Sequence, residues 1–317
     1  MSASGSNSSK MESDRQRDDR AVQAIAAKPP RLIPFESRPV YPCRDFGKSE
    51  IEIDSLSVTT FNALCDWHAS DRIQTEKRLP EIARHLHICH ADIIAIQEAT
   101  PILLEHLLAQ DWMKTYYISE WLPGESLKPY GVLLLSRFPF TVVEHSFSTH
   151  KRVLVGTWQL GDRNLHVATL HLPSDFADYA REQRHSQLKK VLTYLNALPG
   201  DSILAGDFNT RGDDLDELVA RSQWCDVWQK LHPNEPGYTF DPPSNPLAAS
   251  NSQSGRGARF DRILLRNPDS TWKPRAIELF ACEPVPGTGG QLYPSDHFGL
   301  RAIFKKKQYE SSRVGNW

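Results

Sequence analysis

The stretch Ile203-Leu204-Ala205-Gly206-Asp207-Phe208-Asn209 places an acid and an amide directly after a short apolar run. An apolar run of this length predicts a buried strand, and the polar residues then lie where the strand opens into a loop. A carboxylate there can accept a proton or hold a cation, and Asn209 can orient a phosphate oxygen or a water. Turn and side-chain capping chemistry is the alternative interpretation of this pair.

Four other segments also place a polar residue at the end or border of an apolar run. They are Thr60-Phe61-Asn62, Gln97-Glu98, Thr169-Leu170-His171 and Ser295-Asp296-His297. Each offers a side chain that can ligate a metal ion or transfer a proton. The five segments together supply the parts that hydrolysis of a phosphodiester needs.

In chain order, the polar residues of these segments resemble the motifs of the endonuclease/exonuclease/phosphatase superfamily of Mg²⁺-dependent phosphodiesterases. The resemblance extends from about Ser57 to Phe304. Five stretches are similar to the tyrosyl-DNA phosphodiesterase 2 branch of that superfamily: residues 206–211, 226–228, 238–241, 259–263 and 294–300. The resemblance implies an α/β fold, a four-layer α/β sandwich in which two stacked mixed β-sheets are flanked by helices.

The chain length of 317 residues suits one large core with tails. Residues 1–45 are expected to be a disordered or extended segment, because residues 1–30 have too few apolar side chains to offset the entropy of ordering. The catalytic domain is expected over residues 46–306, and residues 307–317 form a C-terminal tail.

The formal net charge is −2, so binding to a phosphate backbone requires a local basic patch. Lys305-Lys306-Lys307 is a candidate, and a solvated domain end is the alternative. Five scattered cysteines without a C-x-x-C pair indicate neither a zinc site nor a disulfide framework. No apolar run approaches the roughly 18 residues of a membrane span, and no signal-peptide core is present, so we expect an intracellular protein in cytoplasm or nucleus.

Hydrophobic periodicity predicts a strand that ends at Asn62, a helix with Thr75 as N-cap, and a strand over residues 92–96 that leads to Glu98. A meander of antiparallel strands is expected over residues 115–119, 131–136, 141–147, 153–160 and 165–172. Helices are expected over residues 178–197 and 214–221, and further strands over residues 260–266, 276–282 and 298–304. The Pro-, Ser-, Asn- and Gly-rich residues 241–258 predict a mobile surface loop near the site.

Glu98 is the candidate for direct contact with Mg²⁺, with Asn62 and Asp296 nearby, because Mg²⁺ takes one or two carboxylates plus waters and substrate phosphate. Mn²⁺ is a possible substitute. A salt-bridged strand-end residue is the alternative interpretation of Glu98. Asp207 is the candidate base for the attacking water, and Asn209 holds that water or a phosphate oxygen.

His297 and His171 are expected to donate hydrogen bonds to the non-bridging phosphate oxygens, since imidazole can carry charge near neutral pH. Asp261 is the candidate partner that fixes the His297 tautomer. Tyr130 and Ser174 are predicted to contact the substrate. His85, His87 and His90 follow a helical surface pattern and are not interpreted as a ligand cluster.

The resemblance also implies how the leaving group is held. In the tyrosyl-DNA phosphodiesterase 2 branch an arginine stacks on an aromatic ring, and the matching positions here are Arg211 and Phe240. The branch has Trp at the second position, so Phe240 implies a weaker cation–π contact. A surface arginine paired with Asp213 or Asp214 is the alternative. The chain also departs from the branch near Phe176, where a basic residue is usual.

These residues predict an Mg²⁺-dependent phosphodiesterase that acts on nucleic-acid 5′ ends, single-stranded or frayed, with 5′-phosphotyrosyl adducts as the favoured substrate. The alternatives are an RNA or DNA exonuclease, a deadenylase-like nuclease, and an inositol or phospholipid phosphodiesterase. Residues 260–264 partly overlap the inositol phosphatase pattern but lack the basic and Trp/Cys residues expected before it. A non-catalytic binding protein is disfavoured because Glu98, Asp207 and His297 are all present. No membrane association and no protein partner is inferred.

Overall fold

The computed structural model describes residues 37–40, 51–66, 70–120, 126–148, 151–175, 179–211, 213–268 and 271–307. Within these ranges the strands form two sheets, one of seven strands and one of six. The seven-stranded sheet, called sheet A, has the order β1-β6-β7-β8-β9-β11-β10. Its strands are β1 (Ser37–Val40), β6 (Thr141–Ser146), β7 (Arg152–Leu160), β8 (Arg163–His171), β9 (Asp201–Asp207), β11 (Asp261–Arg266) and β10 (Cys225–Asp226).

The six-stranded sheet, called sheet B, has the order β12-β13-β2-β3-β5-β4. Its strands are β12 (Trp272–Phe280), β13 (Gly299–Lys306), β2 (Ser55–Asn62), β3 (Ile93–Ala99), β5 (Gly131–Ser136) and β4 (Tyr117–Ile118). The helices are α2 (Ser70–Ile73), α3 (Thr75–Cys89), α4 (Pro101–Leu108), the 3₁₀ helix η1 (Asp111–Thr115), α5 (Ala180–Ala197), α6 (Asp213–Arg221), α7 (Val227–Leu231) and α8 (Pro246–Asn251).

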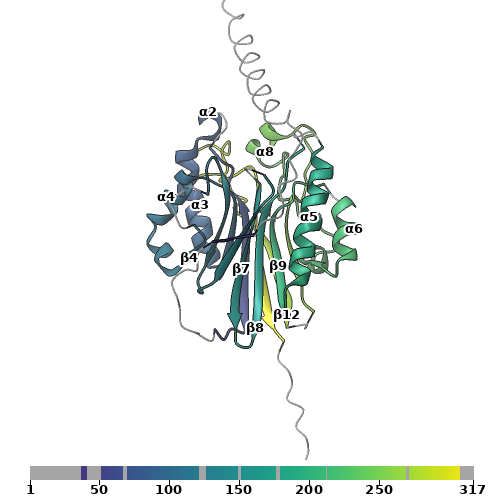
Figure 1. The fold of residues 1–317 in the computed structure, drawn as a ribbon. Helices are drawn as coiled ribbons and strands as arrows, with labels where there is room; N and C mark the ends of the chain where they lie inside the picture. Colours follow the sequence, from purple (N-terminus) through teal and green to yellow (C-terminus); the bar gives the residue numbers. More distant parts are fainter. Residues whose placement is uncertain are drawn as a thin grey trace, which may run out of the picture.

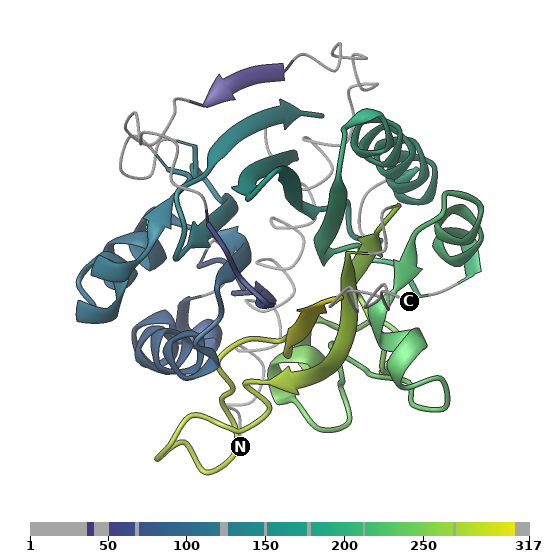
Figure 2. The same cartoon turned by 90° about the horizontal axis from the view of Figure 1, so that it is seen from below.

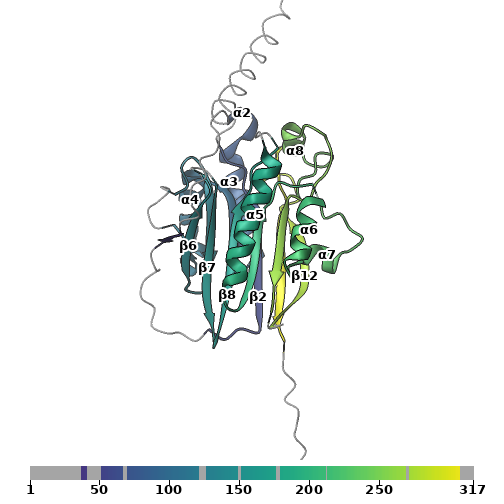
Figure 3. The same ribbon diagram turned by 45° about the vertical axis from the view of Figure 1, so that its right-hand side comes forward.

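The layers follow from which side chains each strand buries. Helices α3 and α4 cover the outer face of sheet B, and α5 and α6 cover the outer face of sheet A (Figure 1; Figure 3). Viewed from below, the two groups of helices lie on opposite sides of the strands (Figure 2). One core lies between the sheets and one lies under each pair of helices. The predicted four-layer α/β sandwich is confirmed.

The first four residues of β3, Ile93–Ile96, form an uninterrupted apolar run. Ile93 and Ala95 pack into the core between the sheets, whereas Ile94 and Ile96 pack under α3 and α4. Successive side chains of a strand point to opposite faces, so a strand covered on both faces needs apolar residues at every position.

Two parallel strand pairs determine where polar residues gather. Strands β2 and β3 are parallel, with Asn62 opposite Gln97, and β8 and β9 are parallel, with His171 opposite Asp207. Helices α3 and α5 lie in the connections between these strands. The carboxyl ends of each parallel pair therefore lie at one edge of its sheet, which is where catalytic residues of α/β folds collect.

The predicted meander is wrong in one respect, because its strands belong to two sheets. Strands β4 and β5 pair in sheet B, and β6, β7 and β8 pair in sheet A. Leu134 of β5 and Val142 of β6 both pack into the core between the sheets. The chain thus crosses from one sheet to the other after β5, and apolar periodicity alone does not distinguish stacked strands from paired ones.

The predicted mobile loop over residues 241–258 is also wrong, because it contains α8. Asn245 is fully buried, and its side chain accepts from the backbone N–H groups of Leu247 and Ala248. Its amide donates to the Ser295 carbonyl at 2.8 Å. Buried contacts such as this one anchor the segment, and composition does not reveal them.

Smaller differences concern the ends of elements. Thr75 is the first residue of α3, and the N-cap is Gln74, which makes no side-chain capping bond. Strand β1 pairs with β6 ahead of residue 46, where the catalytic domain was expected to begin. Residues 1–36 and 308–317, which include most of the predicted tails, lie outside the described residues. None of the described helices is long and apolar enough to cross a membrane.

Candidate active site

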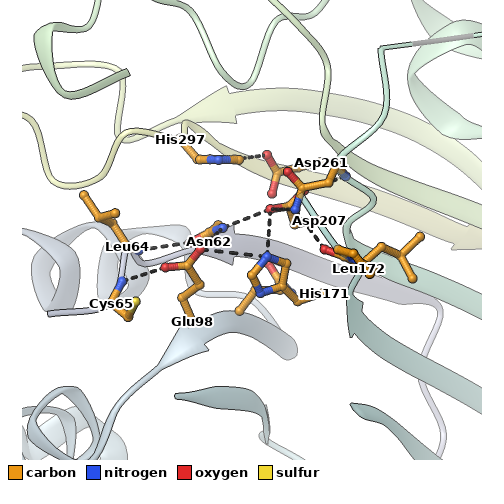
Figure 4. A network of polar contacts seen from close by, with 12 residues as sticks. Asn62, Leu64, Cys65, Glu98, His171, Leu172, Asp207, Asp261 and His297 are labelled. Carbon is orange, nitrogen blue, oxygen red and sulfur yellow. Dashed lines mark hydrogen bonds and ion pairs between the residues drawn. The ribbon is translucent and has the colours of Figure 1, made fainter. Parts of the chain in front are cut away.

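Three polar residues stand side by side at the edge of sheet A. His171 ends β8, Asp207 ends β9, and Asp261 begins β11. The register places Asp207 opposite both His171 and Asp261. Strand β9 has β8 as a parallel neighbour and β11 as an antiparallel neighbour, and this pairing brings the three ionisable side chains next to one another (Figure 4).

Sheet B contributes Asn62 and Glu98 from the opposite side (Figure 4). The Asn62 amide nitrogen lies 3.2 Å from Glu98 Oε1 and 3.0 Å from Asp207 Oδ2, so it joins two carboxylates. His171 Nε2 lies 3.8 Å from Glu98 Oε1 and 3.6 Å from Asp207 Oδ2. The sequence-predicted residues Asn62, Glu98, His171 and Asp207 therefore meet between the two sheets.

The site backbone adopts conformations that side chains usually avoid. Leu64, Glu98 and Asn209 have φ values of 53°, 54° and 51°. At Glu98 the ladder with β5 skips a residue, which marks a bulge that re-aims the side chain. Asn209 is held by its N–H on Asp207 Oδ1 at 2.8 Å and by its amide on the Leu172 carbonyl at 3.0 Å. Such strain collects at functional sites.

The pKa values of the two central carboxylates, Glu98 and Asp207, are shifted in opposite directions. Burial opposes ionisation of Glu98, but the His171 ring, the Cys65 N–H at 2.8 Å and the Asn62 amide outweigh it and lower its pKa. Burial raises the pKa of Asp207 to about 7, with Asp261 adding to the rise, against the effect of His297. Glu98 is thus a permanent anion at neutral pH, and Asp207 can exchange a proton.

The two histidines also differ. Burial would lower the pKa of His297, but Asp261, Asp296 and Asp207 raise it well above its ordinary value. His297 Nδ1 lies 2.8 Å from Asp261 Oδ2, so the acid predicted behind this imidazole is in contact with it. Burial and then the Lys151 charge lower the pKa of His171 to about 3. Burial and Lys151 thus disfavour the charged form of His171, against Glu98, and the expected role of this ring at the phosphate stays a prediction.

A divalent metal could be held at either of two places, the cluster of Asp207, Asp261 and His297 or the carboxylate of Glu98. Asp207, Asp261 and His297 form one cluster whose ligand atoms all lie within 4.8 Å of one another. His297 Nδ1 is already engaged by Asp261 Oδ2 at 2.8 Å, so this ring is a poor ligand. Glu98 is ionised with its side chain 17% exposed, and hard carboxylate oxygens fit Mg²⁺ or Mn²⁺. In the described part of the chain, Asp261 Oδ1 is buried without a hydrogen-bond partner, which also fits a cationic or donor group at the site.

The comparison with family models decides the class. The model of the Endonuclease/Exonuclease/phosphatase family matches residues 59–297. The chain belongs to this family. It is therefore a hydrolase of the phosphodiesterase class, in which a divalent metal is typical. A search of curated protein sequences gives no significant match.

Solved structures share the family fold. Humanized D. rerio TDP2 is 23% identical, with a TM-score of 0.63 over 80% of this chain and 100% of that one. D. rerio TDP2 complexed with single strand DNA product is 22% identical, with the same TM-score and coverage. Staphylococcus aureus beta toxin is 20% identical, with a TM-score of 0.61 over 78% of this chain and 99% of that one. At these identities the likeness concerns the fold alone.

The stacking partner of Arg211 differs from the expected one. Its guanidinium carbon lies 5.2 Å from the centroid of the Phe260 ring, and its Nη1 donates to the Arg256 carbonyl at 3.2 Å. Phe240 is buried, and its ring lies 5.2 Å from Phe260 and 5.3 Å from His297. Phe240 thus supports the stack from behind, so the predicted Arg211–Phe240 contact is wrong. The alternative partners Asp213 and Asp214 have side chains outside the described set.

Lys151 is a site residue that the sequence did not reveal. Its ammonium donates to the Leu172 carbonyl at 3.2 Å and lies 5.8 Å from the centroid of the Tyr130 ring. Burial lowers its pKa to about 8, against the charges of Glu98 and Asp207. Tyr130 in turn lies 6.0 Å from the His171 ring. Lys151 belongs to none of the motifs quoted above, so its place in the site becomes apparent only from the pairing of β7 with β8.

The remaining predicted residues are placed as follows. Ser174 is half-buried in the turn after His171, and its role in binding stays a prediction. Asp296 accepts from Asn251 at 2.8 Å and from Ser295 at 3.3 Å, and its part in metal binding also stays a prediction. Lys305, Lys306 and Lys307 are exposed at the far end of β13 from His297, so this basic run lies outside the site.

Proposed function

We propose that this enzyme is an Mg²⁺-dependent phosphodiesterase that hydrolyses phosphodiester bonds at nucleic-acid 5′ ends, with a 5′-phosphotyrosyl adduct as its favoured substrate. The observation that carries the proposal is the meeting of His171, Asp207 and Asp261 from sheet A with Glu98 and Asn62 from sheet B. The DNA product bound to D. rerio TDP2 supports a nucleic-acid substrate by analogy of fold. Mn²⁺ is a possible substitute for Mg²⁺, and such a substrate suits an intracellular location.

Asp207 takes the proton of the attacking water. Its pKa of about 7 matches that task, because a base near the working pH combines correct ionisation with driving force. Asn209 bonds both Asp207 oxygens, at 2.8 and 3.1 Å, and Asn62 bonds Oδ2 at 3.0 Å. These neutral donors aim the carboxylate without adding charge.

His297 stabilises the charge on the non-bridging oxygens of the phosphate. Asp261 holds its Nδ1, which leaves Nε2 to donate, and the raised pKa keeps the ring positive. His171 contributes a second hydrogen bond to these oxygens. Glu98, with Asn62 and Asp296, would hold the Mg²⁺, which polarises the phosphate and stabilises the leaving oxygen when bound.

Arg211 and Phe260 face the leaving group in this proposal. A cation held on an aromatic ring presents a flat surface against which a tyrosyl ring can pack. Phe240 and His297 pack edge to face beside it, at 5.3 Å between ring centroids. The stack thereby connects the leaving-group side to the ring that contacts the phosphate.

The test is hydrolysis by purified protein of 5′-tyrosyl DNA, 5′-tyrosyl RNA, unmodified single strands, a polyadenylate strand and an inositol phosphate, with Mg²⁺, Mn²⁺ or chelator. We expect release of tyrosine from the tyrosyl strands in metal and none in chelator, with Glu98→Gln as the inactive control. Faster shortening of unmodified strands would favour an exonuclease or deadenylase-like enzyme. Phosphate release from the inositol substrate alone would replace the nucleic-acid proposal.

A further inference from the structure

A buried arginine lies beneath the metal-binding side of the site. Arg78 is in the first turn of α3 and is 1% exposed. Its guanidinium donates to four backbone carbonyls: Ile73 at 2.7 Å, Ala63 at 2.9 Å, Leu64 at 2.9 Å and Pro294 at 2.8 Å. Arginine presents five N–H donors in a rigid fork, so a single side chain can hold several peptide groups in fixed relative positions.

Two of these carbonyls belong to peptide groups that face the site. The peptide between Ala63 and Leu64 presents its carbonyl to Arg78 and its N–H to Asn62 Oδ1 at 3.0 Å. The next peptide presents its Leu64 carbonyl to Arg78 and its Cys65 N–H to Glu98 Oε2 at 2.8 Å. A peptide group is planar and trans, so fixing its carbonyl fixes the direction of its N–H.

The third carbonyl connects the other loop of the site. Pro294 directly precedes Ser295, whose hydroxyl donates to the Asn62 carbonyl at 2.7 Å. Ser295 is followed by Asp296 and His297. Arg78 therefore ties the loop after β2 to the loop before β13, and both loops carry residues of the proposed metal and phosphate site.

The conformation of Leu64 shows that the loop needs such support. Its φ of 53° is left-handed, which is energetically costly for a residue other than glycine. The Arg78 bonds on both sides of Leu64 offset this cost. Hydrogen bonds in a chain also polarise one another, so a charged donor on each carbonyl strengthens the N–H on the opposite side.

We propose that Arg78 is a positioning residue, which aims Asn62 and Glu98 at the metal through the two peptide groups between Ala63 and Cys65. The functional part of this inference rests on the proposed metal-dependent hydrolysis. Loss of a group that orients a metal ligand typically costs about 10- to 100-fold in metal affinity. Lysine keeps the charge but replaces the fork with one compact ammonium, so Arg78→Lys separates geometry from charge.

The experiment compares Arg78→Lys with Arg266→Lys. Arg266 also donates to two backbone carbonyls, those of Gly200 at 3.1 Å and Asn196 at 3.2 Å, at the opposite end of β11 from Asp261. We expect Arg78→Lys to speed amide hydrogen exchange at Leu64 and Cys65 and to weaken Mn²⁺ binding about tenfold by calorimetry, with kcat lowered and KM little changed. Arg266→Lys should change none of these.

Unchanged exchange at Leu64 and Cys65 in a folded Arg78→Lys protein would overturn the inference, as would faster exchange with wild-type Mn²⁺ affinity. If Arg78→Lys does not fold, the wild type supplies the test by nuclear magnetic resonance. Addition of Mg²⁺ should then shift the Arg78 Nε–H signal and leave that of Arg266 in place, and an unmoved Arg78 signal overturns it. A wild type that binds no divalent metal would instead defeat the proposed function. The exchange result tests separately whether Arg78 holds the peptide groups between Ala63 and Cys65.

Discussion

Glu98 and Asp207 face each other from opposite sheets and share one amide, that of Asn62, yet their pKa values move in opposite directions. Glu98 receives the Cys65 N–H and keeps its side chain 17% exposed, whereas Asp207 is 1% exposed and has Asp261 beside it. Asp207 accepts as many hydrogen bonds as Glu98 and more, but its burial and the like charge of Asp261 outweigh them and raise its pKa. Asp207 is therefore suited to move a proton, and the ionised Glu98 is suited to hold a cation. Environment, rather than residue type, assigns the two roles.

Removing the charge of Glu98 should have the largest effect on activity. Glu98→Gln keeps the shape of the side chain but removes the anionic ligand, and we expect turnover to fall by about 10⁴-fold, since metal stabilisation of the transition state is worth several kcal/mol. Steady-state kinetics on 5′-tyrosyl DNA at saturating Mg²⁺ measures it. Unaltered thermal unfolding confirms that the fold is intact, and near-normal turnover would make Glu98 a structural residue.

Loss of the base should have the next largest effect. Asp207→Asn should lower kcat by about 10³-fold, within the range for general acid–base catalysis, with a much smaller change in KM. His297→Ala should act in the same way through the lost oxyanion contact. If either variant raised KM and left kcat alone, its residue would bind substrate rather than act on the transition state.

The pH dependence of the stability of the metal-free protein should show the raised pKa of Asp207. Folding raises the pKa of Asp207 from 3.8 to about 7, so the folded state favours the protonated acid and loses stability as pH rises between these values. Wild type should therefore lose stability relative to Asp207→Asn between about pH 4 and pH 7, by on the order of 5 °C in Tm. Thermal unfolding of both proteins in chelator tests this. A constant difference between them would contradict the raised pKa.

The smallest effect concerns the leaving-group side. An exposed cation–π contact is worth about 0.5 to 1 kcal/mol, so Arg211→Ala should lower kcat/KM for a 5′-tyrosyl strand by roughly two- to fivefold. Because Arg211 rests on Phe260, Phe260→Leu should add little to Arg211→Ala, whereas Phe240→Leu should add its full effect. A double-mutant cycle with each phenylalanine measures this difference. Coupling to Phe240 alone would restore the partner that the sequence suggested.

The sequence placed at strand ends several of the residues that meet between the two sheets. Asn62, His171 and Asp207 each end a strand, and a period-two apolar pattern locates such ends. The pattern also placed Glu98 near the end of β3, although the bulge that turns its carboxylate toward sheet A leaves no mark in the sequence. Local periodicity thus located the strand ends, and the family resemblance grouped their residues into one site, but neither showed how the side chains are aimed.

Other features depend on contacts between distant parts of the chain. Lys151 reaches the site because β7 and β8 pair, and Asn245 anchors α8 on a carbonyl 50 residues away. Arg211 could be placed beside an aromatic ring, but the choice between Phe240 and Phe260 depends on which of them is buried behind the other. Electrostatics were equally hidden, because the lowered pKa of His171 follows from its burial and from Lys151.

The side-chain amide of Gln97 bonds both Thr60, at 3.1 Å in its own sheet, and Thr169, at 2.9 Å in the opposite one. Gln97 and Thr169 lie one and two positions from Glu98 and His171. These two buried hydrogen bonds help to set the spacing between the sheets. In the proposed mechanism, the same spacing separates the metal ligand Glu98 from the base Asp207. Exchanging Thr169 for a larger or smaller residue should therefore change the spacing between Glu98 and Asp207 from inside the core, without altering either carboxylate.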